Sequence, residues 1–103
     1  MNISMDNQIY QEILKLYEKY LLKPASEFSV QDYNNFEQEM WSLKEKFSCE
    51  SSPFLLLPDS AKDADFFMMN ASSDGFVEPN LADKQKYLDI MQESYQKFKN
   101  QLN

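Results

Sequence analysis

Apolar residues recur at helical spacing in three parts of the chain, residues 5–22, 29–48 and 81–102. In each part, successive apolar positions are separated alternately by three and four residues, which is the period of one helix face. The stripes are Ile9, Ile13, Leu16 and Tyr20; Tyr33, Phe36, Met40, Leu43 and Phe47; and Leu88, Met91, Tyr95, Phe98 and Leu102. The pattern predicts an all-α fold, a small antiparallel bundle of three long helices.

Capping residues support two of these helix boundaries. Ser29 precedes Asp32 by three positions, which is the spacing of a capping box with aspartate in place of the usual glutamate. Asn80 and Asp83 repeat that spacing before the last helix. Pro24 ends the first helix, because the residue before a proline is driven out of the helical region.

The connection between the second and third long helices, residues 49–80, is too long to be a structureless loop in a compact domain. It contains two apolar blocks, "FLLL" at 54–57 and "FFMM" at 66–69. Pro53 and Pro58 bracket the first block, which suggests an extended segment laid across the bundle.

Two structures are open for the second half of this connection. Ser60 and Asp63 at capping-box spacing, followed by good helix formers, favour a short helix over about 61–71 and a turn at "SSDG". The alternative is a hairpin with strands at 66–70 and 76–78.

Neither structure buries the whole "FFMM" block on one face. Four consecutive residues of a helix spread around most of its circumference, and a strand directs two to each side. Either the "FLLL" and "FFMM" blocks cover each other, or part of this apolar surface is exposed and binds a partner.

The negative charge is concentrated in the same region. Residues 25–80 carry eleven acids and three lysines, net −8, whereas residues 1–24 are neutral and residues 81–103 carry +1, which together give the net charge of −7. A negative field beside an apolar patch attracts a basic protein surface. A face that only aids solubility is the simpler interpretation of the charge alone.

Missing residue types exclude several classes of function. The chain has no histidine, and all ten of its basic residues are lysine. Histidine-based catalytic sites therefore cannot form, and we expect no catalytic residue, no metal site, no cofactor and no binding to nucleic acid. The single cysteine, Cys49, is expected to be a small apolar residue near a helix end.

Length and hydropathy indicate one acidic helical domain over residues 1–103. No apolar run approaches the roughly 20 residues needed to span a bilayer. The first twenty residues carry charges where a secretory signal has its apolar core. We therefore expect a cytoplasmic protein without a membrane partner.

These observations favour a non-enzymatic, acidic protein-binding protein, which could also form a homodimer. The first hypothesis is an inhibitor, such as an immunity protein, an antitoxin or a phage-type anti-defence protein, that occludes a basic, nucleic-acid-handling target. The alternative is a helical chaperone or adaptor that binds an amphipathic client helix in an apolar groove. The predicted partner-binding residues are the acids Glu37, Asp59, Asp63 and Asp65, with Phe66, Phe67, Met68 and Met69 as the apolar part.

Overall fold

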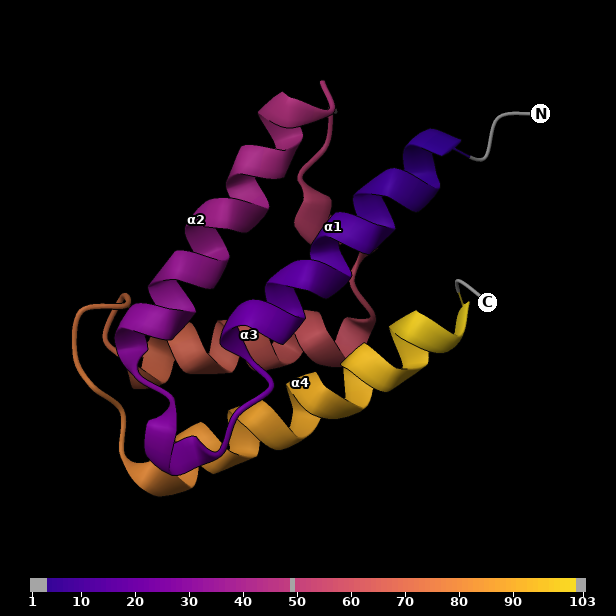
Figure 1. Ribbon diagram of the computed structural model, residues 1–103. Coiled ribbons are helices and arrows are strands. Elements are labelled where there is room, and N and C mark those ends of the chain that lie inside the picture. The colour runs from indigo at the N-terminus through magenta and orange to yellow at the C-terminus, as the bar shows by residue number, and fades with distance from the viewer. Residues whose placement is uncertain (1–3, 49, 102–103) are drawn as a thin grey trace.

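The computed structural model describes residues 4–48 and 50–101, which form helices and connections and contain no strand (Figure 1). The elements are α1 (Ser4–Tyr20), the 3-10 helix η1 (Ala25–Glu27), α2 (Val30–Lys46), the 3-10 helix η2 (Pro53–Leu56), α3 (Asp59–Ala71) and α4 (Leu81–Gln101). The predicted all-α class is therefore confirmed. None of the described helices is both long and apolar enough to cross a membrane.

The helices are arranged in two neighbouring pairs (Figure 1). The chain returns along α2 beside α1, and α4 lies beside α3. The pairs are joined where α1 contacts α4, and η1 packs on α4 while η2 packs on α2. The core lies between these pairs.

The predicted caps are present at the starts of α2 and α4. The backbone N–H of Asp32 donates to Ser29 Oγ at 3.2 Å, and the backbone N–H of Ser29 donates to Asp32 Oδ2 at 3.0 Å. At α4, the backbone N–H of Asp83 donates to Asn80 Oδ1 at 2.8 Å. These bonds satisfy amide groups that have no partner inside the helix.

The periodic apolar stripes form the core. Its buried side chains from the predicted stripes are Ile9, Ile13, Leu16, Tyr20, Tyr33, Phe36, Met40, Leu43, Leu88, Met91, Tyr95 and Phe98. Phe47 is partly buried against them, and Leu102 lies outside the described residues. Tyr87, which falls outside the predicted stripe of α4, is also fully buried, with its ring 5.7 Å from Phe28 and 5.9 Å from Tyr33.

The connection between α2 and α4 confirms the favoured short helix and differs from the prediction in two details. Its second half forms the helix α3, so the hairpin alternative is wrong. This helix begins after Pro58, and Ser60 lies inside its first turn, so the predicted Ser60–Asp63 cap is also wrong. The "FLLL" block is a 3-10 turn opened by Ser52 and Pro53 rather than an extended segment. Cys49 lies outside the described residues.

Candidate functional site

The "FLLL" block packs on α2 and leaves two of its side chains exposed. The Phe54 ring lies 5.7 Å from the Trp41 ring, and Leu57 is buried in the core. Leu55 and Leu56 are 62% and 38% exposed. The hypothesis that the two apolar blocks bury each other is therefore wrong, because each block has exposed members.

The "FFMM" block spreads around α3 as helix geometry requires. Met68 has no exposed surface, so its predicted role as an anchor for a partner is wrong. Phe67 is half-buried on the side facing α4, where the Lys86 ammonium lies 4.4 Å from its ring centroid. Phe66 is 61% exposed and Met69 36%, and at this spacing the two side chains are neighbours on the helix surface.

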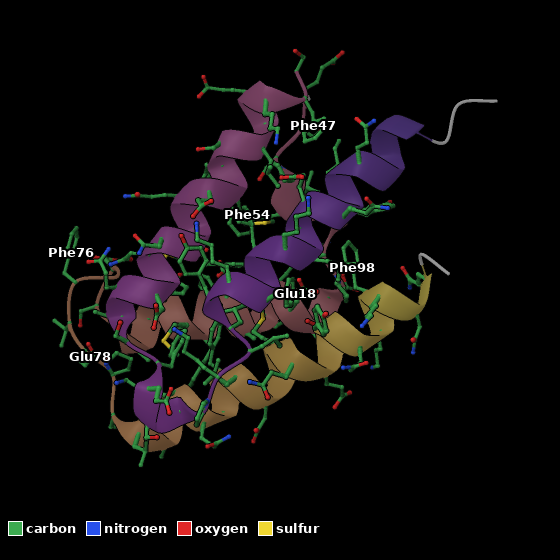
Figure 2. The ribbon with its side chains drawn as sticks, viewed as in Figure 1. Glu18, Phe47, Phe54, Phe76, Glu78 and Phe98 are labelled. Carbon is green, nitrogen blue, oxygen red and sulfur yellow. The ribbon has the colours of Figure 1, made fainter. Side chains whose placement is uncertain are left out.

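The turn after α3 presents the most exposed large apolar side chain described. Phe76 is 86% exposed and points away from the helices (Figure 2). Just before it, Ser73, Asp74 and Gly75 have φ values of 51°, 65° and 85°. Left-handed conformations of residues other than glycine are unfavourable and persist only where the surroundings fix them.

Hydrogen bonds fix this turn on both sides of Phe76. The Ser72 carbonyl accepts from the backbone N–H groups of Phe76 and Val77, at 3.1 and 2.7 Å. Asn34 Nδ2 on α2 donates to the Gly75 carbonyl at 2.6 Å. Glu78 accepts from the Val30 backbone N–H at 3.0 Å. The exposure of Phe76 therefore follows from a fixed backbone and not from a loose loop.

A pocket of about 410 Å³ lies between α2, the end of α3 and this turn. Its lining residues are Gln31, Tyr33, Asn34, Glu37, Gln38, Met69, Asp74, Gly75 and Phe76. Two of these are acids, none is basic, and neither acid forms an ion pair with any residue in the described part of the chain. We call the three apolar residues Phe66, Met69 and Phe76, with Glu37 and Asp74, the Phe76 surface.

Asp65, which was predicted to contact a partner, does not line this pocket but lies behind Glu37. Its side chain is hydrogen-bonded to Glu37, and the Tyr33 hydroxyl donates to its backbone carbonyl at 3.4 Å. Burial, followed by the hydrogen bond to Glu37 and its charge, raises the pKa of Asp65 to about 9. Asp65 is therefore protonated at neutral pH and donates to the Glu37 carboxylate. The described residues contain no group of three or more potential metal ligands.

The other two predicted acids lie on the outward face of α3. The Asp59 side chain is 98% exposed and lies 3.5 Å from Lys62 Nζ. Asp63 is also exposed, and the spacing of these two acids places them on the helix face that carries Phe66. The structure therefore brings Asp59, Asp63 and Phe66 onto one exposed face that leads towards the pocket.

Lysines from outside residues 25–80 neutralise part of the negative charge of that segment. Lys19, Lys23 and Lys84 pair with Glu39, Asp32 and Glu78 at 3.2, 3.2 and 2.6 Å. The acids without such a pair, including Glu37 and Asp74, are therefore those that give the Phe76 surface its negative charge.

The four lysines of α4 are each engaged within the chain. Lys84 pairs with Glu78, and Lys97 pairs with Glu93 at 3.2 Å. Lys86 and Lys99 lie over the rings of Phe67 and Tyr95. A nucleic-acid site on α4 would need these four ammonium groups, which already contact other side chains of the protein. The absence of nucleic-acid binding stays a prediction.

We expect the protein to lose stability as pH rises from about 4 to about 9. In this range folded Asp65 retains a proton that the unfolded chain, with an ordinary pKa of 3.8, releases. The slope for one proton is at most about 1.4 kcal/mol per pH unit. Asp65→Asn keeps a donor towards Glu37 and should flatten the decline, and it should stabilise the protein at pH 8.

Urea unfolding at several pH values measures this effect. Asp63→Asn is the matched control, because it makes the same substitution at an exposed position of the same helix. Its stability curve should run parallel to that of the parent protein. If the Asp65→Asn curve is parallel as well, Asp65 does not hold the proton.

Comparisons of this chain with protein-family models, curated proteins and solved structures found no match. The candidate surface therefore rests on its geometry. Sequence reasoning identified Glu37, Phe66 and Met69 but missed Phe76 and Asp74. The available signal was the "SSDG" turn followed directly by a phenylalanine.

Proposed function

We propose that this protein acts without enzymatic activity, by binding another protein that carries a basic surface and occluding it. One observation carries the proposal: Phe76 is 86% exposed, is held there by a hydrogen-bonded turn, and borders a pocket with two acids. A large aromatic anchor beside a charged pocket is the composition of a binding hot spot. An inhibitor of the immunity, antitoxin or anti-defence type, directed at a nucleic-acid-handling target, fits this surface best.

The proposed site combines steering and anchoring. The carboxylates of Glu37, Asp74, Asp59 and Asp63 raise the association rate of a basic protein by long-range attraction. Phe76 and Phe66 then exclude water from the contact and slow dissociation. We infer that the three long helices and the shorter α3 form an antiparallel bundle, which supports this surface rigidly. On this proposal the protein is cytoplasmic.

The charge component is tested with the partner recovered on a column of the immobilised protein and then purified. Asp74→Asn should lower its association rate several-fold at low salt, and the difference should shrink as salt screens the attraction. Asp89→Asn makes the same charge change on the exposed surface of α4 and should have a smaller effect. Association that ignores both salt and Asp74 would overturn the steering role.

A second candidate function has one observation in its favour. Leu55 and Leu56 are exposed and line a separate pocket of about 410 Å³ together with Ile9 and Pro53, and the exposed Trp41 lies against Phe54 of the same 3-10 turn. This apolar surface could receive an amphipathic client helix, as in a chaperone or adaptor. Binding that is insensitive to salt and lost with Trp41→Ala would favour this function over the inhibitor.

A further inference from the structure

The carboxyl groups of Glu37 and Asp65 meet between α2 and α3 at the edge of the pocket. Glu37 lines the pocket, whereas Asp65 lies behind it and is hydrogen-bonded to Glu37. The atoms Glu37 Oε2 and Asp65 Oδ1 are buried, and the described residues offer no other donor to either. A single proton shared by the two groups is the donor that this arrangement requires.

Neutral hydroxyl groups surround this pair on its buried side. The titratable groups that face Asp65 are Glu37 and Tyr33 from α2, Tyr17 from α1 and Tyr87 from α4. Tyr87 is fully buried and its hydroxyl has no hydrogen-bond partner among the described residues. Burial is the main cause that raises the pKa of all three tyrosines, so none supplies a charge. The pair is thus a buried anionic site with unused hydrogen-bonding capacity.

The open side of the pocket suits a planar cation. Glu37 and Asp74 supply carboxylates, the side chains of Gln31 and Gln38 supply amide oxygens, and Phe76 supplies an aromatic face. A guanidinium group carries five donors in one plane and stacks on aromatic rings, whereas an ammonium group is compact and strongly hydrated. Arginine fits this set of groups better than lysine.

We infer that the pocket binds an arginine side chain of the partner, and that its guanidinium group at Glu37 displaces the proton shared with Asp65. This inference rests on the proposed function and names the chemistry that its site recognises. The proton passes to solvent, both carboxyl groups become carboxylates, and no other bond changes. The guanidinium then supplies donors where the shared proton was.

Binding is therefore linked to pH. Each arginine bound releases up to one proton, so the affinity should rise by up to about tenfold per pH unit while the free protein holds that proton. The raised pKa of Asp65 places this range on both sides of neutrality. A steering interaction alone would show no such dependence, because it does not displace the proton shared by Glu37 and Asp65.

The probe is Nα-acetyl-arginine methylamide, compared with the citrulline analogue, which has the same shape and no charge. Nuclear magnetic resonance follows the backbone amides of Asn34 and Gly75 for binding and the carboxyl carbon of Asp65 for its proton. The arginine probe should shift both amides, should move the carboxyl carbon towards its carboxylate position, and should bind more tightly at higher pH. The citrulline probe should do none of these.

Two variants give the controls. Glu37→Gln should weaken binding of the arginine probe at least tenfold, whereas Asp89→Asn, which removes one carboxylate from the exposed surface of α4, should leave it nearly unchanged. The amide spectrum shows whether each variant is folded. If the Glu37→Gln variant does not fold, the inference is tested by the two probes and the pH series on the parent protein.

Three results would overturn the inference. These are equal shifts with both probes, no shift with either, or arginine binding that leaves the Asp65 carboxyl carbon in place. If a basic partner still binds through Phe76 in any of these cases, the proposed function stands and only the arginine pocket fails.

Discussion

Replacing Phe36 with alanine should destabilise the protein by about 3–5 kcal/mol, the range for removing a large aromatic side chain from a core. Phe36 has no exposed surface, and its ring lies edge-on to Tyr17 with the centroids 5.6 Å apart. It belongs to the stripe of α2 that faces α1. The cavity left behind therefore opens where the two helices contact each other, and collapse of the surroundings can fill it only in part.

Thermal and urea unfolding measure this loss. For a domain of this size, 1 kcal/mol shifts the melting temperature by roughly 4–8 °C, so the Phe36→Ala variant should melt far below the parent protein. Phe66→Ala is the matched control, because it makes the same change at a side chain that is 61% exposed. Similar melting of the Phe36→Ala variant and the parent would show that the core lies elsewhere.

The core could be predicted from the sequence because it depends on local periodicity. Residues such as Ile13, Phe36 and Met91 lie inside because each occupies an apolar stripe with the period of a helix. The capping box at Ser29 is equally local, since its two hydrogen bonds join residues three positions apart. The burial of Tyr87 could not be predicted in this way. Its ring is covered by Phe28 and Tyr33, and the apolar stripe of α4 does not show these contacts.

The candidate site depended on contacts between distant residues, which the sequence pattern does not encode. Asp65 and Glu37 meet only because the fold brings this part of α3 against α2, so an acid predicted to contact a partner became a buried proton donor. The turn at Ser73 and Asp74 takes its left-handed form from hydrogen bonds with Ser72 and with Asn34 on α2. The exposure of Phe76 follows from that turn. Local propensity could therefore predict the turn but not that the Phe76 side chain is exposed on it.

Replacing Phe76 with alanine should weaken binding of the basic partner by about 2 kcal/mol or more, which is roughly thirtyfold in the dissociation constant. The loss should appear mainly as faster dissociation, because Phe76 acts after the complex has formed. The stability of the free protein should stay within about 0.5 kcal/mol of the parent, as is usual for an exposed side chain. Phe76 is 86% exposed and has little surface to lose from the fold.

Trp41→Ala is the control for a general loss of apolar surface. Trp41 is another large aromatic residue, 51% exposed, but it lies on α2 against Phe54, away from the Phe76 surface. Its removal should leave the dissociation rate of the partner within about twofold of the parent value, given how few interface positions contribute strongly to affinity. A loss of partner binding well beyond twofold with this variant would move the site to the surface around η2.

Surface plasmon resonance of the purified partner on the parent, Phe76→Ala and Trp41→Ala proteins, with urea unfolding of the same preparations, measures both quantities. The expected result is fast dissociation from Phe76→Ala alone, with all three proteins unfolding in the same range of urea. Partner binding by Phe76→Ala that equals the parent, or that falls only in proportion to lost stability, would contradict a binding role for the Phe76 surface.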